Sequence, residues 1–82
     1  MPRVSGIVLD RFTGDPIQGA LVIICGRRTT SDSEGRFSFE DVPVGRCFAS
    51  CYAEGYESAA RVVDVTGDIT LTFLLTPKVG LL

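Results

Sequence analysis

The sequence predicts an all-β protein, a seven-stranded antiparallel Greek-key sandwich. Seven short segments alternate apolar and polar residues, which is the pattern of strands with one buried face. Turn-forming residues separate them every 8–12 residues or so, roughly the spacing of β-sandwiches. No segment sustains an apolar repeat of about 3.6 residues, so we expect little or no helix. The 82 residues suffice for a single domain, residues 1–82.

Turn chemistry separates the first three expected strands. The first covers residues 3–10 and is followed by the turn residues Thr13-Gly14-Asp15-Pro16. The second, residues 20–25, is apolar throughout, so something is expected to cover both of its faces. Residues 26–28 then turn into a short third strand near Thr29.

The fourth strand, residues 36–40, has the most informative surroundings. Asp32 and Gly35 supply a tight turn before it, because aspartate bonds its own backbone and glycine tolerates positive φ. Phe37 and Phe39 then alternate with polar residues, as in a half-buried strand. A Val-Pro-Val-Gly stretch ends the strand, because proline cannot continue a ladder.

The last three strands are expected at residues 46–53, 59–65 and 69–75. Glycine-containing connections at residues 54–57 and 66–68 separate them. Alternation then assigns inward positions along all the strands. These are Val4, Gly6, Val8, Val22, Ile24, Phe37, Phe39, Cys47, Ala49, Cys51, Ala53, Val63, Val65, Leu71, Phe73 and Leu75.

Several motifs along the chain together carry a family resemblance. They are Ser5-Gly6-Ile7-Val8-Leu9-Asp10, residues 13–20, Val22, residues 30–45, Ala53-Glu54-Gly55-Tyr56 and residues 71–77. In this order and spacing the chain resembles the carboxypeptidase regulatory-like domain of the transthyretin-like (prealbumin-like) sandwich group, over a core of residues 3–77. The resemblance implies a non-catalytic domain, often appended to a larger protein, whose second and fifth strands are neighbours in one sheet.

On those two neighbouring strands the outward positions are unexpectedly apolar. They are Leu21, Ile23, Cys25, Phe48 and Tyr52. An outward face of an antiparallel sandwich usually reads polar, and a continuous apolar patch on a small domain marks an interface. We therefore expect these five residues to contact a second copy or a partner domain. Two alternatives remain: a one-residue register slip, which would expose Val22 and Ile24 instead, or a cover from a loop or tail of the same chain, such as residues 79–82.

The three cysteines are predicted to be free thiols. Cys47 and Cys51 lie four residues apart on one strand, about 13 Å, whereas a disulfide needs Cα atoms within roughly 7 Å. Cys25 is assigned to the opposite face from both. Free thiols fit a reducing compartment, and no apolar leader follows Met1, so a cytoplasmic location is favoured if the chain is a complete gene product.

The inventory of side chains argues against an enzyme. The chain has no histidine and no asparagine, which excludes Ser–His and Cys–His nucleophile systems and His-ligated zinc. Transthyretin-like hydrolases of a purine breakdown product depend on histidines, so the resemblance does not extend to their site. No catalytic residue, cofactor or metal is predicted. A net charge of −2 gives no attraction for nucleic acid, and no apolar run approaches the roughly 18 residues of a membrane span.

Three weaker candidate sites each have a structural explanation. Asp32 and Glu34, with Asp41, could ligate calcium, but a turn leading into the fourth strand explains them better. Tyr52 and Tyr56 could stack on a sugar, although Tyr56 better fits a corner residue that packs its ring and bonds its hydroxyl locally. The arginines that could form a basic cluster, more often a solvated rim, are Arg27, Arg28, Arg36 and Arg46.

Two classes of function follow from this sequence. The first is a non-catalytic interaction module, self-associating or docked on a partner through the apolar outer face. The second is a carbohydrate- or cell-surface-binding accessory domain of a larger secreted protein. The apparent lack of a leader and the unpaired cysteines favour the first.

Overall fold

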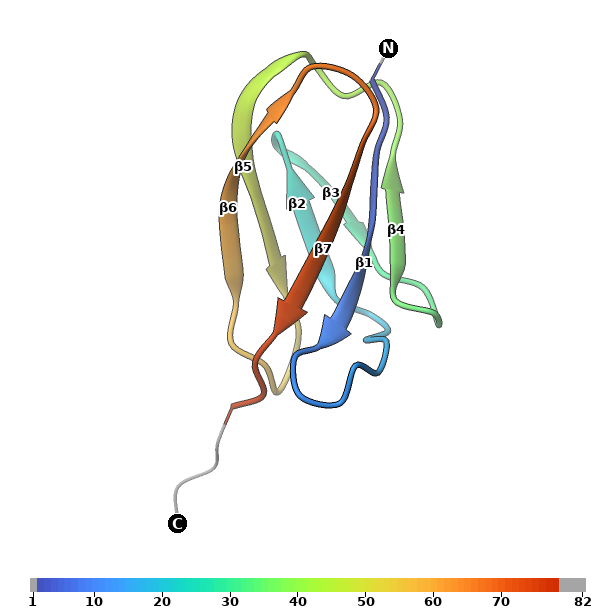
Figure 1. Cartoon of the computed structure of the whole chain (residues 1–82), viewed down its shortest axis with the longest axis vertical. Coiled ribbons are helices and arrows are strands. Elements are labelled where there is room, and N and C mark those ends of the chain that lie inside the picture. Colours follow the sequence, from blue (N-terminus) through green and yellow to red (C-terminus); the bar gives the residue numbers. More distant parts are fainter. Residues whose placement is uncertain (1, 79–82) are drawn as a thin grey trace.

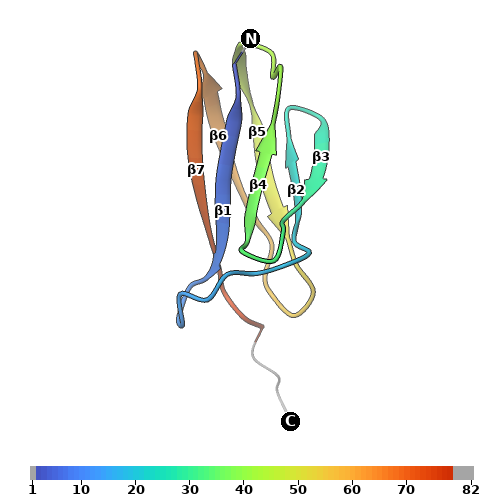
Figure 2. The ribbon, with the colours of Figure 1, turned by 90° about the vertical axis from the view of Figure 1, so that its right-hand side faces the viewer.

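The computed structural model describes residues 2–78, which form two β-sheets packed face to face (Figures 1 and 2). The strands are β1 (Val4–Asp10), β2 (Leu21–Ile24), β3 (Arg27–Thr30), β4 (Arg36–Phe39), β5 (Gly45–Tyr52), β6 (Ala59–Val65) and β7 (Ile69–Leu75). The described residues contain no helix, and hence none long and apolar enough to cross a membrane. The all-β sandwich predicted from the sequence is confirmed.

The two sheets have the strand orders β4-β1-β7 and β3-β2-β5-β6. Strands β2 and β5 are neighbours, as the family resemblance implies. The ladders between the described strands are antiparallel except for β1–β7, which pairs in parallel from Val4 beside Ile69 to Asp10 beside Leu75. A parallel pair needs a long connection, and here the intervening strands, most of them in the second sheet, supply it.

The core lies between the sheets and follows the predicted alternation. Phe73 is fully buried, and its ring centroid lies 6.1 Å from that of Phe37. The Arg61 guanidinium lies 5.0 Å from the centroid of the Phe73 ring, a cation–π contact. Of the positions predicted to face inward, only Gly6 and Cys47 are half-buried rather than buried.

Gly6 lets the β1 backbone lie close to its neighbours in the three-stranded sheet. A Cβ atom at this position would overlap the Leu71 carbonyl oxygen and lie 2.6 Å from the Phe37 ring. Any larger residue would therefore push β1 away from β7 or displace the Phe37 side chain.

Candidate functional site

The outer surface of the β3-β2-β5-β6 sheet carries an apolar patch. Its members, which we name the outer β2–β5–β6 face, are Leu21, Ile23, Phe48, Tyr52 and Val62. On β2, Val22 and Ile24 are fully buried, so the residues that alternate with them point outward. The alternative register, which would have exposed Val22 and Ile24, is therefore wrong. The other alternative, a cover from residues 79–82, lies outside the described residues.

Pairing across the sheet makes this patch continuous. Leu21 lies opposite Tyr52 in the β2–β5 ladder, and Phe48 lies opposite Val62 in the β5–β6 ladder. The exposed fractions of Phe48, Tyr52 and Val62 are 73%, 59% and 53%, whereas Leu21 and Ile23 are half-buried. Three large apolar side chains on adjacent strands are thus open to water.

Charged residues border the patch. Arg28 on β3 lies opposite Ile23, and on the other side Arg46 and Asp64 form an exposed ion pair at 3.2 Å. An apolar centre with a polar rim is the usual anatomy of a protein interface. Val62 is not among the residues predicted for this face, although the alternation that buries Val63 already places it outward.

Cys25 does not belong to this face, and the prediction that it does is wrong. Strand β2 ends at Ile24, and Cys25 adopts a left-handed conformation with φ of 51°. Strand alternation therefore stops one residue earlier than expected, and the Cys25 side chain packs against the core instead of pointing outward.

Cys25 forms a disulfide with Cys47, the first inward-facing residue of β5. Their Cα atoms are 5.2 Å apart, within the range that the bond requires. The prediction of three free thiols is therefore wrong, and the argument for a reducing compartment that rested on it no longer holds. Cys51 remains free and fully buried, and burial raises the pKa of its thiol to about 11.

Asp10, the last residue of β1, forms a hydrogen-bonded pair with Tyr56. One Asp10 carboxylate oxygen accepts hydrogen bonds from the amides of Phe12 (2.8 Å) and Thr13 (3.0 Å), and the other accepts one from the Tyr56 hydroxyl at 2.9 Å. The Thr13 amide is the largest cause of a lowered Asp10 pKa, and the bond to Asp10 raises the pKa of Tyr56. The arrangement holds the first loop against the β5–β6 connection. The Tyr56 hydroxyl is hydrogen-bonded, but its partner is Asp10 on β1, at a sequence separation of 46, and not the local group that was predicted.

We expect Tyr56→Phe to lower the melting temperature by several degrees, because it leaves a buried carboxylate oxygen without its donor. Asp10 stabilises the fold above its unfolded pKa of 3.8, and this contribution is lost as pH falls through the lower folded value. The variant should lose stability at a higher pH than the parent as acid is added. Thermal unfolding between neutral pH and about pH 2 measures both effects.

The matched control for that experiment is Tyr52→Phe. Tyr52 is exposed, and its hydroxyl forms no hydrogen bond with the residues described here. Removing it should leave the melting temperature and its pH dependence unchanged. Equal behaviour of the two phenylalanine variants would contradict the role assigned to Tyr56.

Asp32 serves the turn before β4. One of its oxygens accepts hydrogen bonds from the amides of Glu34 (2.9 Å) and Arg36 (2.8 Å). Gly35, with φ of 75°, brings its carbonyl within 2.7 Å of the Val8 amide. Within residues 2–78, acidic and cysteine side chains form no cluster of three that could hold a metal ion.

The four arginines that could form a basic cluster lie in different parts of the molecule. Arg27 donates to the Glu40 carbonyl at 2.7 Å, and Arg46 pairs with Asp64. Arg28 lies on the outer surface of the four-stranded sheet and Arg36 on the other sheet. The structure therefore does not bring the four together.

Known structures with the same fold come from different functional classes. The chain is 24% identical to chains from two interface mutants of a type II cohesin–X-dockerin complex of Acetivibrio cellulolyticus. For the C-terminal mutant the TM-score is 0.79, covering 92% of this chain and 57% of that one; for the N-terminal mutant the values are 0.81, 94% and 58%. The chain thus spans less than two thirds of those chains.

A third similar structure is the 5-hydroxyisourate hydrolase of Klebsiella pneumoniae. The identity is 21% and the TM-score 0.72, with 93% of this chain and 91% of that one covered. At these identities the likeness concerns the fold. No curated protein sequence gives a significant match.

The family assignment rests on the sequence itself. Residues 3–76 match the carboxypeptidase regulatory-like domain, nearly the whole of the two-sheet sandwich described above. The extent agrees with the core expected from the motifs in the first, fourth and seventh strands. The chain belongs to the carboxypeptidase regulatory-like domain family.

Proposed function

We propose that this domain is a non-catalytic protein-interaction module that docks through the outer β2–β5–β6 face. The observation that carries the proposal is the exposure of Phe48, Tyr52 and Val62 on adjacent strands. Aromatic residues are enriched at interface centres, and a flat apolar sheet face left in water favours aggregation. The absence of histidine from the sequence supports a binding role over hydrolysis.

The simplest occupant is a second copy of this chain in a symmetric dimer. A two-fold interface uses the same patch on both copies, and a flat face can pack on itself. The rim carries both signs of charge, at Arg28 and at the Arg46–Asp64 pair, so self-association brings no large excess of like charge together. The Cys25–Cys47 disulfide favours an oxidising setting for this interaction over the reducing one expected from the sequence.

The double variant Ile23→Thr with Phe48→Thr tests the proposal. Threonine keeps the strand propensity and removes the apolar surface. We expect the parent chain to be a dimer at micromolar concentration by size exclusion with light scattering, and the variant to be a folded monomer. Each apolar side chain that the dimer buries would contribute on the order of 1.5–3 kcal/mol before the cost of association.

Other outcomes separate the remaining possibilities. Phe12 is exposed on a loop away from this face, so Phe12→Thr is the matched control and should leave the dimer intact. A monomeric parent whose double variant unfolds like a core mutant would overturn the proposal. A monomeric parent whose variant is equally stable would exclude self-association and leave a partner domain as the occupant.

The accessory-domain reading, binding a carbohydrate or cell surface, is weaker on this face. It relied on paired tyrosines, and Tyr56 is half-buried with its hydroxyl bonded to Asp10. Tyr52 alone remains exposed, next to the aliphatic Leu21. The same double variant would also lose binding to a sugar if this reading held, so neutral oligosaccharides belong in the assay as competitors of the dimer.

A further inference from the structure

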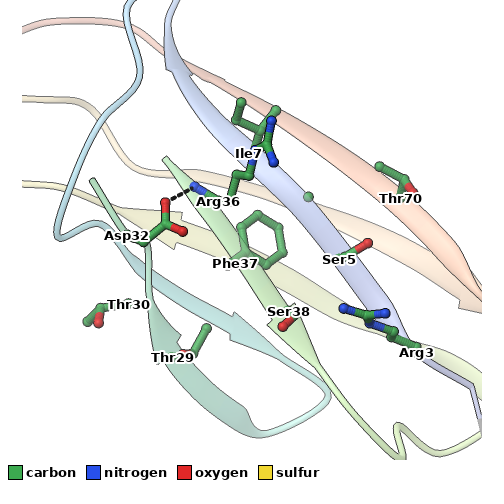
Figure 3. A pocket seen from close by; sticks show the side chains of 11 residues that line it. Arg3, Ser5, Ile7, Thr29, Thr30, Asp32, Arg36, Phe37, Ser38 and Thr70 are labelled. Atoms are coloured by element: carbon green, nitrogen blue, oxygen red, sulfur yellow. Dashed lines mark hydrogen bonds between the residues drawn. The ribbon is translucent and has the colours of Figure 1, made fainter. Parts of the chain in front are cut away.

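A groove on the other sheet is independent of the apolar face. It has a volume of about 600 Å³, crosses the outer side of the β4-β1-β7 sheet and reaches over the edge of β4 towards β3 (Figure 3). Its lining is rich in hydroxyl groups and contains two arginines. Its floor and walls include Arg3, Ser5, Ile7, Arg36, Ser38 and Thr70.

A row of small side chains forms the floor of this groove. Ser5 on β1 lies opposite Ser38 on β4, and on its other side it lies beside Thr70 on β7. Three small outward residues in register across three strands leave a hollow where longer side chains would fill the surface. The floor therefore presents three hydroxyls, each able to donate and accept a hydrogen bond.

Larger side chains form the two walls. Ile7 and Arg36 are opposite one another in the β1–β4 ladder and close one side, with their side chains close together in Figure 3. Arg3, four residues before Ile7 on the same chain segment, stands on the other side. The two arginine backbones are thus separated by on the order of 13 Å along the strands.

The residues that line the groove carry two positive charges, those of Arg3 and Arg36, and one negative charge, that of Asp32. Among the residues described, the Arg36 side chain has no ion-pair or hydrogen-bond partner, and the side chain of Arg3 has only Glu40, at 3.4 Å with both exposed. Such exposed pairs are weak. The single carboxylate in the lining is Asp32, one of whose oxygens is occupied by two backbone amides. Two further carboxylates lie beside Arg3, that of Glu40 and that of Asp68, which accepts a hydrogen bond from the Arg3 amide at 2.8 Å. The unpaired positive charge of the groove is therefore that of Arg36.

We propose that this groove binds an acidic oligosaccharide, a short sugar chain carrying carboxylate or sulfate groups. Guanidinium groups bind planar oxyanions through paired hydrogen bonds, and the hydroxyls of Ser5, Ser38 and Thr70 suit the hydroxyls of a sugar. Two arginines at opposite walls match an elongated ligand with charges spaced along it. The role is distinct from docking, because the floor of the groove lies on the β4-β1-β7 sheet and the outer β2–β5–β6 face lies on the other sheet.

The test is a titration of the isotope-labelled chain with an oligogalacturonate, followed by backbone amide shifts. Saturable shifts are expected at Ser5, Ser38 and Thr70, and the fully methyl-esterified oligomer, which keeps the hydroxyls and loses the charge, should bind at least roughly tenfold more weakly. A sulfated oligosaccharide of neutral sugars, run in parallel, distinguishes sulfate from carboxylate as the preferred group.

Two variants and one control locate the site. Arg36→Gln should weaken binding roughly tenfold, and Thr70→Val, which removes a hydroxyl at nearly constant volume, should weaken it a few-fold. Arg28→Gln removes the same charge from the outer side of the other sheet and should leave oligosaccharide binding unchanged. The proposal is overturned if a simple dicarboxylate binds as tightly, if the ester binds equally well, if the shifts map to the outer β2–β5–β6 face, or if no binding saturates at millimolar ligand.

Discussion

Replacing Phe73 with alanine is expected to lower the free energy of unfolding by roughly 3–5 kcal/mol. Phe73 is fully buried, packs against the ring of Phe37 and lies under the guanidinium of Arg61. The truncation removes apolar contact from both sheets and leaves a cavity. Since a domain of this size is stable by only about 5–10 kcal/mol, denaturant unfolding should detect a large shift of the midpoint.

Leu74→Ala is the control on the same strand. Leu74 points outward and is 43% exposed, so its truncation should cost less than about 1 kcal/mol. Equal costs at the two neighbouring positions would mean that β7 does not alternate between core and solvent. That result would also remove the basis for placing Thr70 in the groove.

Removing the disulfide should have the second largest effect. The double variant Cys25→Ala with Cys47→Ala frees a loop closed over a sequence separation of 22, and the chain-entropy estimate for such a loop is roughly 3 kcal/mol. The variant should unfold at lower denaturant concentration, and the parent treated with reductant should approach it.

Thiol titration in denaturant checks the pairing directly. Without reductant we expect one free thiol per chain, that of Cys51, and three after reduction. In the folded protein Cys51 should react slowly, because it is fully buried and its pKa is raised from 9.0 to about 11. A count of three before reduction would show that the disulfide is absent.

Strand periodicity made most of the fold predictable. The inward positions of Phe37 and Phe39, and of Leu71 and Phe73, follow from the two-residue repeat of a strand alone. The structure buries all four. The same rule placed Phe48 outward. These predictions needed no knowledge of which strands are neighbours.

The rule failed where a strand ended. Alternation predicts Cys25 as the last residue of the second strand, but its positive φ places it in a turn, and its side chain reaches Cys47. Only glycine, and less often asparagine or aspartate, commonly signals such a conformation in a sequence. A cysteine in this conformation gives no sequence signal, so the disulfide was not predictable by alternation.

The groove could not be predicted from sequence for a different reason. Ser5, Ser38 and Thr70 come from three strands, and they form a row only because β1 pairs with β7 in parallel and with β4 in antiparallel register. Each residue alone is an ordinary polar position on an outward face. Their juxtaposition depends on the topology and the register together.

The parallel β1–β7 pair also determines how the sandwich responds to tension. Because the strands run side by side in the same direction, the chain enters β1 at one end of the molecule and leaves β7 at the opposite end (Figure 1). A pull on these two ends slides one strand along the other, so the evenly spaced hydrogen bonds of the ladder carry the force together and do not open one after another. Within a longer polypeptide, the sandwich would act as a stiff spacer that resists extension.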